Sequence, residues 1–332
     1  MLYIYTLKCR FFKILIYLFS ISVFAQQDPQ FSQYMFTHAY MNPAYVGINN
    51  QTEILGLYRS QWTGLKATKD GISGVPYSQM LSASTKIRAI NSGVGLYVVN
   101  DILGPQSNLY IRGSYAYHID ISENTKLGFG ISAGIYRAGI DANKLNPNED
   151  NDPRIDFIKS NPNNTTFDLG GGVWLQNKSF YAGFSINHIN QPSLYKFSKS
   201  SINYESDLYR HYYFTAGYNA RLNENWMLAP SIITKGDLKK FSNLQFDFSA
   251  LAIYNNYKFW GGLSYRHLDA LVAMLGIGLL KNNALRVGYA FDLTIIGNAA
   301  KAGTSHEIMA SYFIPVKELI PKPVIRTPRF RY

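Results

Sequence analysis

The sequence is organised by apolar residues that recur at every second position. Between Leu127 and Tyr136 the odd positions are apolar and the even ones mostly small, and Leu244–Ala250 and Leu285–Leu293 repeat this alternation. Because successive side chains of a β-strand point to opposite faces, a period of two predicts strands rather than helices. After the N-terminus the longest apolar run is Ala270–Leu280. A membrane helix needs about 20 apolar residues, so a helical membrane protein is excluded.

Composition agrees with strands that face lipid. The chain is 47% hydrophobic but only 16% charged, whereas a soluble domain carries about 25% charged residues. Its 26 tyrosines and 20 phenylalanines exclude disorder. The net charge is +11, but the basic residues are scattered rather than clustered, so nucleic acid is not an expected partner.

Fourteen segments show the strand pattern. They are residues 52–60, 77–87, 92–100, 107–119, 126–137, 166–176, 179–188, 210–221, 226–235, 244–254, 259–267, 270–280, 284–292 and 305–313. Most have the 9–11 residues that a tilted strand needs to cross a bilayer, and their number is even. The joints alternate between short turns, such as 88–91, and longer loops, such as 138–165.

This pattern predicts an all-β fold, a transmembrane antiparallel outer-membrane β-barrel of about 14 strands. Backbone groups in hydrocarbon must be paired within the protein, so the sheet must close on itself. Short turns and both termini are expected in the periplasm, with the long loops extracellular. A secreted soluble β-domain is the alternative, although it would not show this alternation of joint lengths.

The segments outside the strands complete the expected organisation. Residues 1–25 combine basic residues, a short apolar core and Ala25 at a cleavable boundary, as in a secretory signal peptide, so the protein is exported. Residues 26–50 are aromatic and are expected to fill the lumen of the barrel, which spans 51–313. Residues 314–332 contain four prolines and a charge of +4, and are expected to form a non-strand periplasmic tail.

No catalytic, cofactor or metal motif is evident. The six histidines are dispersed, with no i, i+4 pair on a helix, and the glycine-rich stretches open no helix. A calcium-loop pattern beginning at Asn148 fails, because Pro153 and Lys159 occupy the positions that require Gly and Glu. The only cysteine, Cys9, precedes the expected cleavage site. A non-enzymatic protein without cofactor is therefore predicted.

Several short motifs carry a family resemblance. They are Asp28-Pro-Gln-Phe-Ser-Gln-Tyr-Met35, Asn42-Pro-Ala-Tyr-Val-Gly47, Tyr58-Arg-Ser-Gln-Trp62, Gly93-Val-Gly-Leu96 with Asn100-Asp101 and Gly104, Trp260-Gly-Gly-Leu-Ser-Tyr-Arg266, Gly288-Tyr289 with Asp292, and Ser305-His-Glu-Ile-Met309. In this order they resemble the PorP/SprF family of outer-membrane proteins. The long basic tail beyond Phe313 departs from the common pattern.

The resemblance implies a component or accessory of the type IX secretion system, the exporter linked to gliding motility and surface adhesins. Its expected partners are the periplasmic lipoprotein ring of that system and the C-terminal domain of a large secreted surface protein, with outer-membrane lipid around the barrel. The residues expected to lock the N-terminal segment to the wall or to bind a partner are Asn42, Pro43, Ala44, Tyr58, Arg59, Trp62, His306 and Glu307. A FadL-like transporter of an apolar small molecule is the alternative, because those barrels also hold an N-terminal plug bearing Asn-Pro-Ala.

Overall fold

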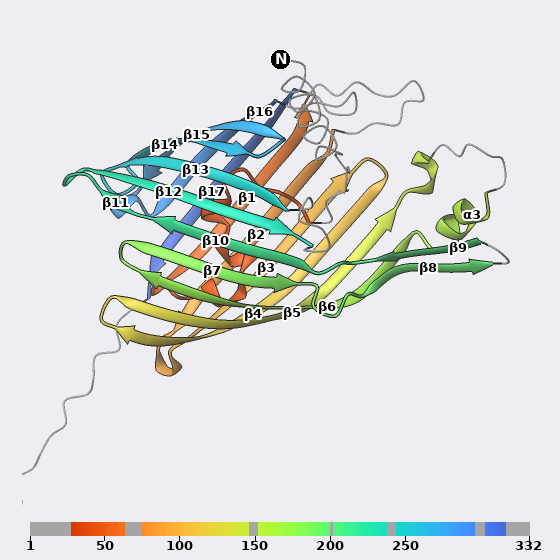
Figure 1. The fold of residues 1–332 in the computed structure, drawn as a ribbon, viewed down its shortest axis with the longest axis horizontal. Coiled ribbons are helices and arrows are strands. Elements are labelled where there is room, and N and C mark those ends of the chain that lie inside the picture. The colour runs from red at the N-terminus through yellow and green to blue at the C-terminus, as the bar shows by residue number, and fades with distance from the viewer. Residues whose placement is uncertain are drawn as a thin grey trace, which may run out of the picture.

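The computed structural model describes residues 28–63, 75–145, 152–199, 202–237, 244–295 and 303–316, which form one closed antiparallel barrel (Figure 1). Its strands are β1 (Gln51–Thr63), β2 (Tyr77–Ile87), β3 (Ser92–Leu103), β4 (Gln106–Ser122), β5 (Thr125–Ile140), β6 (Asn163–Asn177), β7 (Phe180–Asn187), β10 (His211–Tyr218) with its short continuation β11 (Ala220–Arg221), β12 (Trp226–Gly236), β13 (Gln245–Tyr254), β14 (Phe259–Arg266), β15 (Ala270–Leu279), β16 (Leu285–Thr294) and β17 (Thr304–Pro315). Taking β10 and β11 as one, the barrel has 14 strands, and it closes where β1 pairs with β17.

Each strand expected from the alternation is present, with ends that differ by at most three residues. β17 continues through Ile314 and Pro315, two residues past the expected end of the barrel. Proline is tolerated there because β16 pairs with β17 only as far as Tyr312, so the missing N–H removes no bond to that neighbour. The expected signal peptide, at 1–25, and the rest of the tail, from 317, lie outside the described residues.

Two elements lie in connections that the sequence suggested were loops. Helix α3 (Pro153–Ser160) is capped at its N-terminus by Asp152, whose side chain accepts a hydrogen bond from the Arg154 backbone N–H. Strands β8 (Ser193–Lys199) and β9 (Ile202–Asp207) form a separate hairpin that projects beside α3 from one end of the barrel (Figure 1). These elements were missed because their sequences are polar and lack a regular apolar face.

The period of two separates the two faces of the barrel wall. Large apolar side chains such as Ile54, Leu81 and Leu263 are exposed on the outside, while Leu55, which directly follows Ile54 in β1, is buried. An outward apolar face is the surface that lipid contact requires. No helix in the described part of the chain has the length and apolar character of a membrane span.

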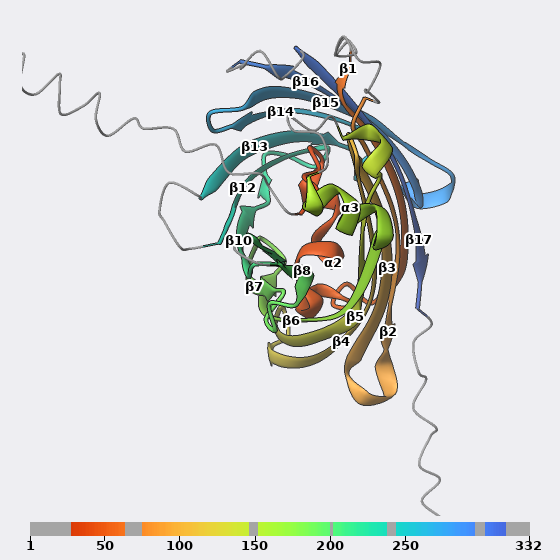
Figure 2. The same ribbon diagram turned by 90° about the vertical axis from the view of Figure 1, so that its right-hand side faces the viewer.

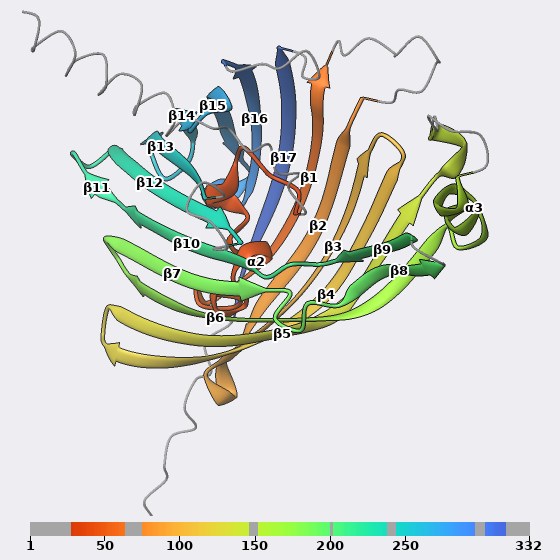
Figure 3. The same ribbon diagram turned by 45° about the vertical axis from the view of Figure 1, so that its right-hand side comes forward.

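Residues 28–50, which we call the lumen segment, lie inside the ring of strands (Figures 2 and 3). The segment forms three short helical turns, η1 (Tyr34–Phe36), α2 (His38–Met41) and η2 (Pro43–Tyr45), and then continues into β1. Most of its side chains are buried. The segment therefore replaces water as the filling of a barrel whose diameter would otherwise leave a channel.

Candidate functional site: the contacts that hold the lumen segment

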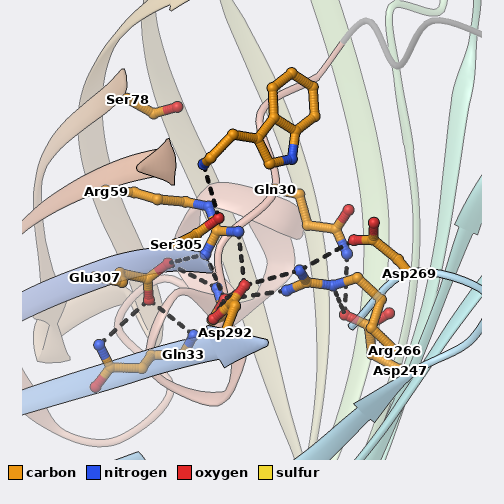
Figure 4. Close-up of polar contacts among 12 residues, drawn as sticks. Gln30, Gln33, Arg59, Ser78, Asp247, Arg266, Asp269, Asp292, Ser305 and Glu307 are labelled. Carbon is orange, nitrogen blue, oxygen red and sulfur yellow. Dashed lines mark hydrogen bonds and ion pairs between the residues drawn. The ribbon is translucent and has the colours of Figure 1, made fainter. Parts of the chain in front are cut away.

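A buried network of charges crosses the lumen beside the start of this segment (Figure 4). Asp292 on β16 lies between two guanidinium groups: its Oδ2 is 2.7 Å from Arg59 Nη2 and 3.0 Å from Arg266 Nη1. Arg59 Nη1 is also 3.3 Å from Glu307 Oε2, and Arg266 Nε is 3.2 Å from Asp247 Oδ2. Five strands, β1, β13, β14, β16 and β17, are thereby joined through Asp292, its partners and theirs.

The lumen segment is bound directly into this network. The backbone N–H groups of Ser32 and Gln33 donate to the two carboxylate oxygens of Glu307, over 2.7 and 2.8 Å. The Ser32 hydroxyl donates to Asp292, over 2.7 Å to Oδ1, and accepts a hydrogen bond from Arg59. Hydrogen bonds to buried charged groups are roughly twice as strong as neutral ones. The carboxylates of the wall therefore set the path of the chain at Ser32 and Gln33.

A second cluster holds the first described residue of the segment. Asp28 Oδ1 is 2.9 Å from His188 Nε2, and Asp28 Oδ2 accepts a hydrogen bond of 2.6 Å from the Tyr213 hydroxyl. The other ring nitrogen of His188, Nδ1, is 2.9 Å from Asp168 Oδ2, and Asp168 is in turn paired with Arg112. Asp28, His188, Asp168 and Arg112 are all buried.

Within this second cluster, neighbouring charges shift the pKa of His188 and of Asp28, both of which lie outside the strands. Burial alone would lower the pKa of His188, but Asp28 and Asp168 together raise it to about 9. Burial alone would likewise raise the pKa of Asp28, but His188 holds it well below its usual range. In the absence of other ligands, the pair is thus a carboxylate and an imidazolium at neutral pH.

The Asn42-Pro43-Ala44 turn packs against β5, β6 and β7. Asn42 accepts a hydrogen bond from the Ala44 N–H over 2.9 Å and donates to the carbonyl oxygens of Val173 and Phe184, over 2.9 and 3.2 Å. Pro43 occupies the first position of η2, where its fixed φ suits a helical turn. A Cβ at Gly130 would lie only 2.2 Å from the Ala44 nitrogen, so the close approach of this turn requires glycine in the wall.

His38 lies in an aromatic enclosure next to this turn. Its ring centroid is 5.2, 4.9 and 5.0 Å from those of Tyr45, Trp174 and Tyr181. Its Nδ1 has no hydrogen-bond partner among the described residues. Burial lowers the pKa of His38 to about 3, and the imidazole is therefore neutral over the physiological range.

The structure brings five of the eight candidate residues to the surface between the lumen segment and the wall, namely Asn42, Pro43, Ala44, Arg59 and Glu307. Tyr58 points to the outside, with 45% of its surface exposed against 2% for Arg59, and stacks on Tyr77. His306 shares the outward face of β17 with Ile308 and contacts Tyr289, whose hydroxyl lies 2.6 Å from its Nδ1. Trp62 lies at the end of β1, where its backbone N–H donates to Ser305 Oγ over 3.0 Å.

Sequence reasoning missed the other charged residues of both clusters. These are Asp28, Arg112, Asp168, His188, Asp247, Arg266 and Asp292. A signal was available, because Arg112, Asp168, Asp247, Arg266 and Asp292 occupy the inward parity of strands whose outward neighbours are apolar. A charged residue at such a position must find a partner inside the barrel.

These features define an outer-membrane β-barrel whose lumen is filled by its own N-terminal segment. Residues 23–312 match the family described as "Type IX secretion system membrane protein PorP/SprF". The chain belongs to this family and is a membrane component associated with type IX secretion.

Solved barrels share the fold at low sequence identity. The toluene transporter TbuX of Ralstonia pickettii is 12% identical, with a TM-score of 0.51 over 84% of this chain and 93% of its own. A TodX monoaromatic hydrocarbon channel with the deltaS2S3 mutation is 13% identical, with a TM-score of 0.51 over 84% of this chain and 94% of its own. At such identities the likeness concerns the fold alone. No curated protein matches the chain.

Proposed function

We propose that this protein is a non-enzymatic outer-membrane component or accessory of the type IX secretion system that supports export or surface anchoring of a large secreted protein, such as a gliding adhesin. Membership of the PorP/SprF family is the observation that carries the proposal. In this role the barrel acts as a fixed anchor in the outer membrane and binds proteins at its two ends.

The filled lumen supports an anchoring role. The seated lumen segment lies against the charged network of the wall, where Ser32 and Gln33 donate backbone hydrogen bonds to Glu307 and the Ser32 hydroxyl donates to Asp292. Withdrawing the segment to open a conduit would remove the hydrogen bonds that Ser32 and Gln33 make to these carboxylates. It would also break the buried ion pair of Asp28 with His188, and breaking such a pair costs about 3–5 kcal/mol. Cargo is therefore expected to pass elsewhere in the secretion machinery, while this barrel holds a partner.

The end of the barrel with short turns is proposed as the periplasmic docking surface. A polar cleft of about 640 Å³ opens there, and its charged lining residues are Lys86, Arg88, Asp120, Glu123 and Lys126. Arg88 donates a hydrogen bond to the carbonyl of Val316, which places the start of the basic tail at the same end. The cleft has three basic and two acidic residues, and the tail that begins at this end is basic. This excess of basic groups favours an acidic partner surface, which we assign to the periplasmic lipoprotein ring.

The opposite end carries the β8–β9 hairpin and α3 and is proposed to face the cell exterior. The hairpin pairs only with itself in the described part of the chain and extends beyond the barrel wall (Figure 3). Long extracellular loops are the usual place for partner recognition in such barrels. We propose that it contacts the C-terminal domain of the secreted protein.

Affinity purification in mild detergent tests these assignments. Three forms are compared: the unchanged chain, a form with the five basic tail residues Lys317, Lys322, Arg326, Arg329 and Arg331 changed to Gln, and a form with 193–207 replaced by a Gly/Ser linker. We expect the tail variant to lose periplasmic components but keep the cargo, and the hairpin variant to do the reverse. If neither a type IX component nor a large secreted protein co-purifies with the unchanged chain, the proposal is wrong.

A transporter of apolar molecules is the second candidate, favoured by the shared fold with hydrocarbon channels. Against it, the cavity between the lumen segment and β10, β12 and β13, lined by Phe31, Met41 and Ile233 among others, has a volume of only about 20 Å³. Small-molecule pockets are usually about 300 Å³ or larger. Uptake of toluene into liposomes containing the purified protein, above the rate of protein-free liposomes, would favour transport over anchoring.

A further inference from the structure

Two histidines and a carboxylate meet where the lumen segment first touches the wall. Asp28 belongs to the segment, His188 directly follows β7, and His211 is the first residue of β10. One oxygen of Asp28 and one ring nitrogen from each histidine all lie within 4.8 Å of one another. Nothing in the sequence indicates this group, because Asp28 and His188 are 160 residues apart.

The surroundings of the three residues resemble the outer shell of a metal site. Asp168 Oδ2 lies 2.9 Å from Nδ1 of His188, which leaves Nε2 directed at Asp28. A carboxylate on the far nitrogen of a histidine is the common arrangement around protein-bound zinc, since it fixes the tautomer and orients the ring. The Tyr213 hydroxyl, 2.6 Å from Asp28 Oδ2, similarly orients the carboxylate and leaves Oδ1 facing His188.

We propose that Asp28, His188 and His211 bind one Zn²⁺ ion, which clamps the start of the lumen segment to β7 and β10. In a tetrahedral site with bonds of about 2.0–2.1 Å, ligand atoms lie roughly 3.3 Å apart. The three ligand atoms therefore need only small side-chain movements to enclose the ion. Water or a further protein oxygen completes the coordination, as in other three-ligand zinc sites.

In the bound state, His188 is a neutral imidazole that donates its Nδ1–H to Asp168 and coordinates the ion through Nε2. The ion then replaces the direct contact between His188 and Asp28. Because the site exists only when Asp28 is seated, zinc binding and seating of the segment are linked, as metal binding and folding are in other proteins. This end of the lumen segment is therefore held more firmly with zinc bound than without it.

The competing interpretation is a metal-free ion pair in which a protonated His188 bridges Asp28 and Asp168. His211 distinguishes the two, because the ion pair does not use it whereas the metal site requires it. The control is His306→Gln, since His306 lies on the outer face, away from the cluster.

The experiment uses the protein purified in detergent with a histidine-free affinity tag, stripped with EDTA and titrated with Zn²⁺. We expect about one Zn²⁺ per chain by calorimetry and elemental analysis, and an intense visible absorption of tetrahedral type when Co²⁺ replaces Zn²⁺. His211→Gln should lower zinc affinity at least 100-fold, Asp168→Asn by about 10- to 100-fold, and His306→Gln not at all.

Heat-modifiable gel mobility identifies variants whose barrels are folded. Absence of stoichiometric zinc in the unchanged chain, or an octahedral Co²⁺ spectrum, would overturn the proposal without reference to any variant. Equal zinc binding by folded His211→Gln and the unchanged chain would also overturn it, since the ion would then be elsewhere. If His211→Gln does not fold, the comparison of Asp168→Asn with His306→Gln decides in the same way.

Discussion

Replacing Arg59 by methionine tests whether the buried charges hold the lumen segment. Methionine keeps much of the length and apolar volume of the arginine stem but removes the guanidinium. The substitution removes the guanidinium that lies 2.7 Å from Asp292, which keeps only Arg266, and 3.3 Å from Glu307. Ser32 also loses a hydrogen bond. Removing one member of a buried ion pair costs about 3–5 kcal/mol, and we expect Arg59→Met to destabilise the seated state by that amount.

Unfolding by guanidinium chloride in detergent micelles, followed by tryptophan fluorescence, measures this loss of stability. Trp174 and Trp260 are suitable reporters, because they pack against His38 and Phe36 of the lumen segment, at 4.9 Å between ring centroids in each case. Release of the segment should therefore change the fluorescence even while the barrel stays closed. Limited proteolysis within 28–50 should become faster in Arg59→Met for the same reason.

Arg154→Met is the matched control. Arg154 also pairs with a carboxylate, Asp152, at 2.9 Å, but its side chain is 54% exposed. Water screens such a pair, so this variant should unfold like the unchanged chain. The double variant Arg59→Met with Glu307→Gln should recover part of the loss, because it removes an unpaired charge. Our reasoning is refuted if Arg59→Met shifts the midpoint no more than Arg154→Met does.

Three further substitutions test the remaining contacts of the segment. In the unchanged chain, the free energy of unfolding should fall by up to about 1.4 kcal/mol per pH unit between pH 6.5 and 3, because the unfolded His38 binds a proton there and the buried one does not. His38→Phe should abolish this contribution. Unfolding measured at about pH 7.5 and about pH 5.5 checks it, and an equal loss of stability in His38→Phe and the unchanged chain would contradict it. Gly130→Ala should lower the free energy of unfolding by about 1–3 kcal/mol, since the new Cβ would lie 2.2 Å from the Ala44 backbone. Gly56→Ala, where the new Cβ has no atom within 4 Å, is its control in the same unfolding assay. Asn42→Ala removes two hydrogen bonds to the wall and the cap of η2, and should lower the unfolding free energy by about 1–3 kcal/mol without altering the strand content seen by circular dichroism; a midpoint equal to that of the unchanged chain would show that the turn is not held by Asn42.

The sequence by itself determined the strands and their two faces. Ile54 and Leu55 follow each other in β1 and point to opposite sides of the wall, and that consequence of the pleat holds for any strand. Joint lengths and an even strand count indicated a barrel in a membrane, and the need to pair every backbone group in hydrocarbon then predicted closure. The interior position of Asn42, Pro43 and Arg59 could also be predicted from the sequence, because they lie in recognisable motifs near the start of the chain.

Only the tertiary structure decided which residues meet across the lumen. Arg59, Arg266 and Asp292 come from β1, β14 and β16, and Asp28, His188 and His211 from the lumen segment, the end of β7 and the start of β10. Their distances depend on the register of every intervening strand pair and on the path of the segment through the barrel. The period of two determines which way a side chain points, whereas closure of the sheet determines which residues it faces.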